Sequence, residues 1–502
     1  MPPSSTSRAG AVAETLTLGI DFGTSAVKAV ALDAAGGVRA LTSAAYQTAK
    51  PAPDRAEQDP QDWWRALGEV SRTVMAALGS ARIGAIGLSG QLNGIVLVDK
   101  AGAVLRPGLI WLDQRCAEET AELELRHADR LAQTASSPIS PIAVLPKLRW
   151  LARHEPGTMR RTARVFQVKD YILWRLTGVA ATEANEASAT LLMDLGRRAW
   201  ADDLVELAGL APAQLPPIRP SDAVAGRVHD AAACATGLPA GVPVVPGSGD
   251  TGALAVGCGA YEAGVAAVTL GTAGHVVAAV PNRGPGAVNG LWRMAHVSAD
   301  RELWLGLIPA GGLSIAWLRN LASGFGGTAT GFEALERLLA AAPAGSAGAT
   351  FLPFLEGAGT PWNDPQRLAG LANLNVTHGA AELVRAVYEG VAFNVRACLD
   401  AFEAAGVGLS RIHLAEGGAS SPAWCQIIAD ALDREVHVVA ERDTSAVGAA
   451  ILARAAIEAA DLAAIVARSV RIERVHRPEP AHRAAMDAAW RRFCAHAGTT
   501  SA

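Results

Sequence analysis

The sequence predicts an α/β protein with two similarly built halves, and three observations lead to that class. Strand and helix signals alternate along most of the 502 residues, which favours helices packed on mixed sheets. Half of the residues are hydrophobic and 18% are charged, enough apolar material for more than one core. A Gly-Thr turn between apolar strands occurs in GTSAVKAVAL (23–32) and again in GTAGHVVAAV (271–280). This repeat predicts two halves on one plan, each aiming a hairpin at a shared cleft.

Local signals predict the individual elements in chain order. Helices are expected where apolar residues have helical spacing and proline or glycine marks an end, at 62–79, 146–154, 169–178 and 380–406. The segment 94–115 is typical of a hairpin that turns at 100–102. A buried strand should follow the Pro-rich connector 210–226, and residues 411–432 should form a strand, a turn and a helix.

These elements give a division of the chain into four parts. We expect a disordered tail at 1–15, an N-terminal domain at 16–246, a C-terminal domain at 247–478 and a helical tail at 479–502. The boundary is placed where the strand GVPVVPGSG ends on a glycine-flanked acid.

Charge and cysteine content exclude several classes of protein. The net charge of −4 offers no basic footprint for nucleic acid and no polybasic membrane patch. The six cysteines lack C-x-x-C or C-x-x-H spacing, so neither a disulfide framework nor a zinc site is expected. The first residues lack an apolar signal-peptide core, and the longest uncharged stretch, 263–282, is typical of a buried strand–turn–strand. We therefore expect a soluble, cytoplasmic protein.

The first candidate site residue is Asp21, at the end of the strand LTLGIDF. A carboxylate there can hold Mg²⁺, while the turn Gly23-Thr24-Ser25 offers N–H and hydroxyl groups to a phosphate. Gly23 allows close approach of the backbone to that anion. The alternative is an Asp that only caps a turn.

The second candidate is Asp250, which follows VPGSG and precedes the helix-like TGALAVG. A helix N-terminus favours the ionised carboxylate, which could then accept a proton from an attacking hydroxyl during phosphoryl transfer. The alternative is a plain N-cap.

Two glycine-rich joints could form a flat surface for an adenine ring. One is Gly417-Gly418, before a helix that starts near Ser421-Pro422, and the other is Gly311-Gly312. The sequence contains neither G-x-x-x-x-G-K-[ST] nor a protein-kinase glycine loop, which disfavours those phosphate-binding folds.

Eight ordered blocks together resemble the FGGY carbohydrate kinases, and among these they are most similar to the xylulokinases. They run from about Leu16 to Ala453 and read GIDFGTSAVKAV, IGLSGQLNGIVLVDKAGAVLRPGLIWLDQR, KDYILWRLTG, VPGSGDTGALAVG, VTLGTAGHV, FLEGAGTPWNDP, ELVRAVYEGVAFNVR and EGGASSPAW. The resemblance implies two actin-like (ribonuclease H-like) ATPase domains flanking a catalytic cleft, the first on the sugar side and the second on the nucleotide side. It also implies ATP and Mg²⁺ as cofactors.

The resemblance assigns roles residue by residue. Asp250 resembles the catalytic base and Asp21 the magnesium-organising acid. The residues similar to the family's nucleotide-binding positions are Gly23, Thr24, Ser25, Gly271, Thr272, Gly312, Gly418 and Ala419. Gln91, Leu92 and Asn93 should line the sugar pocket with Asp250, and Asp113 either binds a sugar hydroxyl or pairs with Arg115.

Two departures from the xylulokinase pattern concern the substrate. Gln91-Leu92-Asn93-Gly94 stands where Gln-Met-His-Gly is typical, so an amide replaces an imidazole that reads sugar hydroxyls. Gly357-Ala358-Gly359-Thr360-Pro361 replaces Gly-Glu-Arg-Thr-Pro and has lost one charge of each sign.

The favoured hypothesis is an ATP-dependent sugar kinase that phosphorylates a terminal hydroxyl of a ketopentose, with D-xylulose as the default. Its rivals are a kinase for another ketose, a sugar alcohol or a modified sugar; an actin-like ATPase with a chaperone or regulatory role; and a non-reactive sugar-binding protein. The expected partners are the sugar and ATP, without nucleic acid or membrane, and a homodimer is an open hypothesis.

Overall fold

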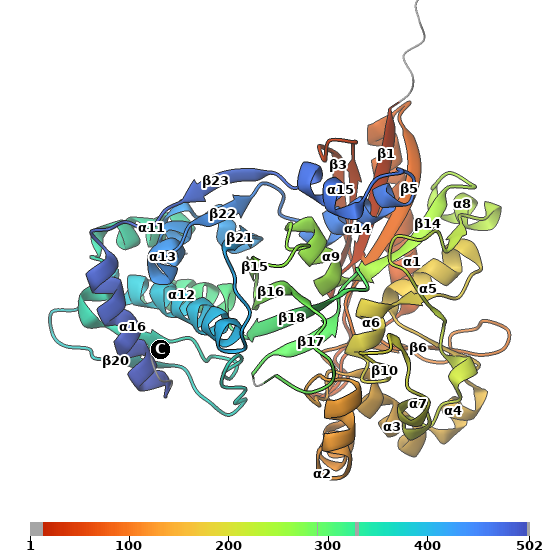
Figure 1. Cartoon of the computed structure of the whole chain (residues 1–502), viewed down its shortest axis with the longest axis horizontal. Helices are drawn as coiled ribbons and strands as arrows, with labels where there is room; N and C mark the ends of the chain where they lie inside the picture. Colours follow the sequence, from red (N-terminus) through yellow and green to blue (C-terminus); the bar gives the residue numbers. More distant parts are fainter. Residues whose placement is uncertain (1–13, 289, 327–330, 499–502) are drawn as a thin grey trace, which may run out of the picture.

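Two sheets and two sets of helices make up the computed structural model, which describes residues 14–288, 290–326 and 331–498 (Figure 1). The first sheet has the order β13 (Gly226–Arg227), β14 (Pro243–Gly249), β5 (Arg82–Gly90), β1 (Thr15–Phe22), β2 (Ala26–Leu32) and β3 (Val38–Ala45). The second has the order β17 (Trp292–Ala295), β18 (Arg301–Ile308), β16 (Gly274–Pro281), β15 (Val265–Leu270), β21 (Arg411–Ala415), β22 (Val436–Val439) and β23 (Ile472–His476). We call the parts built on them the first and second lobes.

The pairing of the strands confirms the internal repeat. The hairpin β1–β2 is antiparallel, and β5 and then β14 run parallel on the other side of β1. The hairpin β15–β16 is likewise antiparallel, and β21 and then β22 run parallel beside β15. The two Gly-Thr turns thus stand at equivalent places in two sheets of the same design.

The remaining strands form short two-stranded pairs at the edges of the lobes. They are β4 (Glu57–Gln58), β6 (Val96–Val98), β7 (Gly108–Leu109), β8 (Arg164–Phe166), β9 (Thr182–Glu183), β10 (Met193–Asp194), β11 (Ala199–Trp200), β12 (Ile218–Arg219), β19 (Thr350–Leu352) and β20 (Gly370–Ala372).

The helices form where the sequence predicts the main ones. In the first lobe they are α1 (Pro60–Leu78), α2 (Ala117–Thr134), α3 (Val144–His154), α4 (Pro156–Arg161), α5 (Val168–Thr177), α6 (Ala184–Ala189), α7 (Asp202–Leu207), α8 (Asp230–Thr236) and α9 (Asp250–Gly257). The later ones are α10 (Gly312–Gly326), α11 (Phe332–Ala341), α12 (Ala380–Ala404), α13 (Pro422–Leu432), α14 (Thr444–Ala455), α15 (Leu462–Ser469) and α16 (Arg483–Ala497). Helix α3 begins two residues before the predicted proline.

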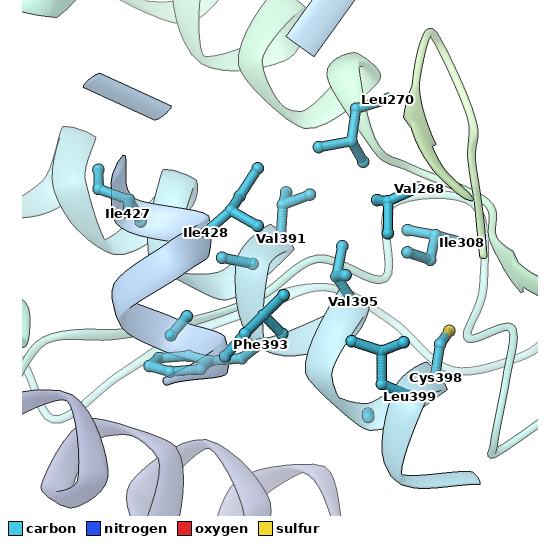
Figure 2. Close-up of a cluster of buried hydrophobic side chains, with 14 of the residues drawn as sticks. Val268, Leu270, Ile308, Val391, Phe393, Val395, Cys398, Leu399, Ile427 and Ile428 are labelled. Carbon is cyan, nitrogen blue, oxygen red and sulfur yellow. The ribbon is translucent and has the colours of Figure 1, made fainter. Parts of the chain in front are cut away.

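Each sheet has one face on its own core and one face toward a shared helix pair. Leu18, Ile20 and Phe22 of β1 pack in a core with α1 and α5. In the second lobe, Val268, Leu270 and Ile308 meet α12 and α13 residues such as Val391 and Ile428 (Figure 2). The opposite face of the first sheet contacts mainly α14, that of the second sheet contacts α9, and these two helices lie between the lobes (Figure 1).

Glycines allow α9 and α14 to cross at backbone contact. A Cβ on Gly448 of α14 would lie 1.8 Å from the Ala253 carbonyl oxygen of α9, and one on Gly257 would lie 2.0 Å from that of Thr444. A side chain at either position would force the helices apart. Because Asp250 opens α9, this crossing fixes its helix relative to both sheets.

The predicted boundaries differ from the elements in three places. The division at 246/247 falls inside β14, which belongs wholly to the first sheet. Helix α16 buries Met486, Trp490 and Phe493 in the second core. Residues 1–13 of the predicted tail lie outside the described residues, and Thr15 already belongs to β1. No described helix combines the length and apolar character needed to cross a membrane.

Candidate active site

Strand register brings Asp21 and Asp250 to the same edge of the first sheet. Strands β1, β5 and β14 are parallel neighbours, with Asp21 opposite Ser89 and Ser89 opposite Ser248. With about 4.8 Å between adjacent strands, β1 and β14 end roughly 10 Å apart. Asp250 follows β14 directly, and the charge of Asp21 raises the pKa of Asp250. Two acids far apart in sequence therefore share one site.

One carboxylate oxygen of Asp21 could hold a metal. Its Oδ1 accepts a hydrogen bond from the Ser89 hydroxyl (2.8 Å), while Oδ2 lies 3.8 Å from the position of a Cβ on Gly23. Burial raises the pKa of Asp21, so a bound cation would relieve the cost of its charge. No three described His, Cys, Asp or Glu side chains could hold a metal together. A single carboxylate can still take part in binding Mg²⁺, because this ion is usually bound by one or two carboxylates plus substrate phosphates and water.

The predicted phosphate loop, Gly23-Thr24-Ser25, is held in place through hydrogen bonds to its carbonyl groups. The Tyr46 hydroxyl donates to the Gly23 carbonyl, and Gln58 Nε2 donates to that of Thr24 at 2.7 Å. The Thr24 hydroxyl accepts from Trp111 Nε1 at 2.8 Å, whereas the Ser25 side chain is exposed. These hydrogen bonds therefore fix the backbone of Gly23 and Thr24 beside the exposed Ser25.

Asp250 is the first residue of α9, after the N-cap Gly249. Its Oδ1 accepts from its neighbour Thr251 through the backbone N–H (2.6 Å) and the hydroxyl (3.2 Å). Burial, and then the charge of Asp21, raise its pKa to about 7. The helix N-terminus favours the ionised form, and burial and the charge of Asp21 act against it.

A pocket of about 560 Å³ in the second lobe contains the predicted nucleotide residues Gly271, Thr272, Gly312 and Gly418. Its other walls are Leu270, Leu313, Ile315, Ala316, Phe332, Glu336, Tyr388, Gly417, Ser420, Ser421 and Trp424. Ala419 is buried behind this surface and is not among the residues that line it. The volume and the mostly apolar walls suit a flat ring with few polar contacts.

Close backbone packing explains two of those glycines. A Cβ on Gly312 would lie 2.4 Å from the Gly271 carbonyl oxygen, which accepts from the Gly312 N–H at 2.7 Å. A Cβ on Gly418 would lie 2.6 Å from Leu270 Cβ. Helix α10 thus starts directly on the second Gly-Thr turn.

The predicted sugar residues follow β5 on the first lobe. Gln91 and Asn93 are buried, and Gln91 Oε1 and Asn93 Oδ1 have no hydrogen-bond partner among the described residues. Leu92 packs on Gly249, with its Cδ2 2.2 Å from the position of a Cβ there. Buried carbonyl oxygens without a donor are costly, so a ligand hydroxyl would satisfy them.

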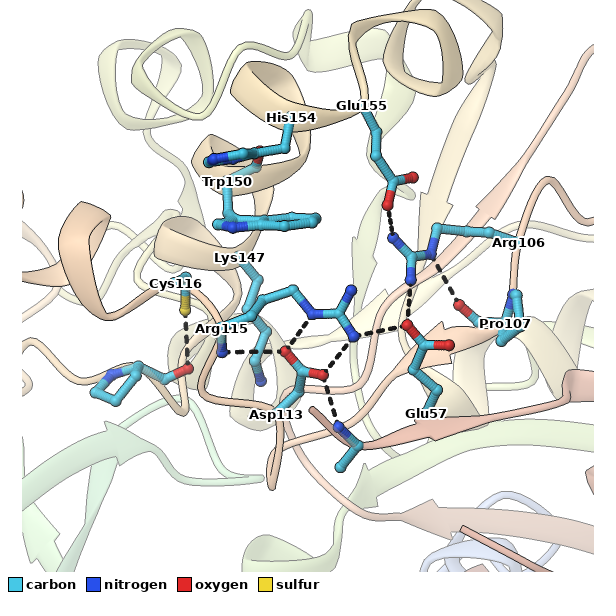
Figure 3. A network of polar contacts seen from close by, with 12 residues as sticks. Glu57, Arg106, Pro107, Asp113, Arg115, Cys116, Lys147, Trp150, His154 and Glu155 are labelled. Carbon is cyan, nitrogen blue, oxygen red and sulfur yellow. Dashed lines mark hydrogen bonds and ion pairs between the residues drawn. The ribbon is translucent and has the colours of Figure 1, made fainter. Parts of the chain in front are cut away.

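Of the two roles predicted for Asp113, the structure has the ion pair with Arg115 (Figure 3). Its Oδ1 accepts from Arg115 Nε and its Oδ2 from Nη2, both at 2.8 Å, and Oδ2 also accepts from the Ala56 N–H at 2.7 Å. The side chain is fully buried. Arg115 also binds Glu57, which joins Arg106 (Figure 3). Asp113 therefore holds the backbone at Ala56, two residues before Gln58, which supports the predicted phosphate loop. Both of its carboxylate oxygens are used in these contacts, so neither is free for a sugar.

Sequence reasoning missed Glu416, which has a φ of 64° beside the second loop. Its Oε2 lies 2.9 Å from the position of a Cβ on Gly271, and burial raises its pKa to about 6. Lys28, from the first lobe, pairs at 2.7 Å with Asp443 at the start of α14. The sequence signal for Glu416 is its place directly before Gly417-Gly418, because a glycine-rich joint between a strand and a helix seldom needs an acid there.

Lys147 was also missed, although its helix was predicted. Its side chain is fully buried beside the loop that follows β5, where Nζ donates to the carbonyls of Asn93 (3.1 Å) and Ile142 (2.6 Å). Burial lowers its pKa to about 7.

The altered loop at 357–361 lies directly on β18. A Cβ on Gly359 would be 2.1 Å from the Leu307 carbonyl oxygen, so the arginine typical of the family has no room there. Thr360 accepts from the Leu307 N–H (3.0 Å) and donates to the Gly290 carbonyl (2.6 Å). At the position of the lost positive charge, the loop thus lies against the backbone of β18.

Comparison with known proteins decides the family. The model of the FGGY family of carbohydrate kinases, N-terminal domain, matches residues 16–257, and that of the C-terminal domain matches residues 266–457. The chain belongs to the FGGY family of carbohydrate kinases. It is 33% identical to a xylulose kinase of Escherichia coli over 443 residues, which cover 88% of this chain and 90% of the relative. A xylulose kinase of Klebsiella pneumoniae is 33% identical over 471 residues, 92% and 94% of the two chains.

A solved relative has the same arrangement of lobes. The crystal structure of xylulose kinase from Rhodospirillum rubrum superposes with a TM-score of 0.88 at 31% identity, covering 96% of this chain and 98% of the other. The predicted two-domain α/β class and the predicted kinase activity are therefore confirmed, and the regulatory ATPase and non-reactive sugar-binding alternatives are set aside.

Proposed function

We propose that this kinase transfers the γ-phosphoryl group of ATP to a terminal hydroxyl of a ketopentose, with D-xylulose as the default substrate and Mg²⁺ as its metal. The observation that carries the proposal is the placement of Asp250 beside Asp21 at one edge of the first sheet. Similarity to xylulose kinases supports the choice of sugar.

The reaction needs a base, a way to neutralise charge, and a site closed to water. The Asp250 carboxylate accepts the hydroxyl proton as the substrate oxygen attacks the γ-phosphorus, the bond to the β–γ bridging oxygen breaks, and ADP leaves. A pKa near 7 suits a base that works near neutral pH. Asp21 would hold Mg²⁺, which when bound neutralises phosphate charge. Closure of the lobes would exclude water from the phosphoryl group.

Recognition of the sugar would rest on the loop after β5. Gln91 Oε1 and Asn93 Oδ1 are buried acceptors that no described residue donates to, so each can accept a hydrogen bond from a sugar hydroxyl. A site that pairs its polar groups with hydroxyls rejects analogues that lack them.

A second candidate substrate is another ketose, a sugar alcohol or a modified sugar. Asn93 favours it, since an amide stands where the xylulokinase pattern has an imidazole.

A sugar panel in a coupled ADP-release assay tests the proposal. We expect the highest kcat/KM with D-xylulose and little ADP without sugar. A different preferred sugar would establish the second candidate, whereas ADP release that no sugar stimulates would refute the proposed function.

A further inference from the structure

A buried polar segment of the first lobe, 182–188, lies against the turn that carries Asp250. Its side chains Glu183, Asn185, Glu186 and Ser188 are all almost completely buried. Charged and amide side chains are rarely buried without a specific partner, so their contacts indicate what they do.

Glu183 binds the backbone immediately before Asp250. Its Oε1 accepts from the Gly249 N–H at 2.9 Å and from the Glu186 N–H at 2.8 Å. Its Oε2 accepts from the Asn185 N–H at 2.7 Å. Hydrogen bonds to an ionised acceptor are among the stronger ones, so the N-cap of α9 is firmly held.

Asn185 binds the turn on the other side of Asp250 and also reaches the second lobe. Its Oδ1 accepts from the Gly252 N–H at 3.2 Å, and its Nδ2 donates to the Ala295 carbonyl of β17 at 2.8 Å. The Ser188 hydroxyl accepts from the Ala295 N–H at 3.0 Å. The backbone around Asp250 and the edge strand of the second sheet are thus joined by one side chain.

Glu183 can be replaced by a neutral residue without leaving Lys169 unpaired, because other carboxyl groups lie beside this lysine. Lys169 is fully buried, 2.7 Å from Asp170 and 3.6 Å from both Glu183 and Glu186. Three carboxyl groups therefore surround one ammonium group. Glu183→Gln removes a negative charge while Asp170 keeps its contact with Lys169.

We propose that Glu183 and Asn185 are positioning residues for Asp250, which hold the backbone on both sides of it so that its carboxylate meets the substrate hydroxyl. This rests on the proposed function, in which Asp250 is the base. A base displaced by about 1 Å costs on the order of 100-fold in rate, even when substrates still bind.

The test compares Glu183→Gln and Asn185→Ala with two matched controls. Ser188→Ala removes the other bond to Ala295 and the bond from the Ser188 hydroxyl to the Asn185 carbonyl (2.7 Å), but it leaves the bonds of the Glu183 and Asn185 side chains to the Asp250 turn in place. Glu389→Gln alters a buried glutamate that accepts from the Gly345 N–H (2.9 Å) and the Ser346 hydroxyl (2.7 Å), residues outside the site. For each folded variant, kcat, sugar KM, ATP affinity by calorimetry and Tm are measured.

We expect the two positioning variants to lose about 10- to 100-fold in kcat with sugar KM and ATP affinity unchanged. The controls should lose comparable Tm but keep kcat. Should Glu183→Gln not fold, Asn185→Ala carries the same test because it leaves the carboxylate in place.

A purely structural role predicts that kcat follows Tm equally in all four variants, and that result would overturn the inference. Asp250→Asn is assayed in parallel. If it is inactive while both positioning variants keep wild-type kcat, only the inference fails; if it remains active, the proposed base fails as well.

Discussion

Replacing the proposed base should stabilise the protein while it removes activity. Burial and Asp21 raise the pKa of Asp250 from 3.8 to about 7. Because the folded-state pKa lies above the unfolded one, ionisation disfavours the folded state, with no effect below pH 3.8 and a full penalty above pH 7. At 1.36 kcal/mol per pKa unit, the shift means that the ionised carboxylate destabilises the folded state by at most about 4 kcal/mol. The side chain is only partly buried, so screening should leave roughly half of it.

The assay is thermal unfolding of wild type and Asp250→Asn at pH 5 and pH 8. A gain of about 2 kcal/mol corresponds to a rise in Tm of roughly 4–8 °C for a unit of 150–250 residues. The gain should be larger at pH 8 than at pH 5, where the wild-type carboxyl is protonated in the folded state.

Asp113→Asn is the matched comparison, since that buried aspartate is paired with Arg115. Breaking such a pair leaves a buried charge and should destabilise by about 3–5 kcal/mol. If Asp250→Asn were no more stable than wild type at pH 8, the electrostatic account of this site would be refuted.

Three further predictions concern other parts of the site. In a pH series, kcat/KM should fall as pH drops below about 7, and Glu416→Gln should move this limb to lower pH because Glu416 raises the pKa of Asp250; an unmoved limb would contradict the coupling. Gly448→Ala should lower Tm strongly and reduce soluble yield, since its Cβ would lie 1.8 Å from the Ala253 carbonyl; wild-type Tm would show that the helix crossing can relax. Asn93→His should change the ratio of kcat/KM between D-xylulose and the other sugars of the panel, and an unchanged ratio would exclude this side chain from recognition.

The parts of the site predicted from sequence are those built by local signals. Asp21 and Asp250 each follow an apolar strand, and each is bordered by glycines that mark the turn. Their meeting could be anticipated because parallel strands end at one edge of a sheet, and the register confirms it. The second Gly-Thr turn was found by its repeat of the first.

The missed residues act through contacts between distant segments. Asn185 binds a strand 110 residues later, and the segment around it is typical of an exposed polar helix. Its burial depends on packing against β14 and β17, which no local pattern shows. The same holds for the pKa of Asp250, because helix position is visible in sequence but burial and the charge of Asp21 are not. From the sequence, the ion pair of Asp113 with Arg115 is only one of two alternatives, because two opposite charges two residues apart do not indicate whether they are buried.

Sugar phosphorylation by Asp250→Ala, measured with ATP affinity on the same preparation, tests the central claim most directly. We expect the rate of phosphorylation to fall by about 100- to 10,000-fold, the usual contribution of a general base, while ATP binds as in wild type because the pocket proposed for the nucleotide is lined by residues of the second lobe. Phosphorylation at the wild-type rate would show that another group takes the proton and would contradict the account.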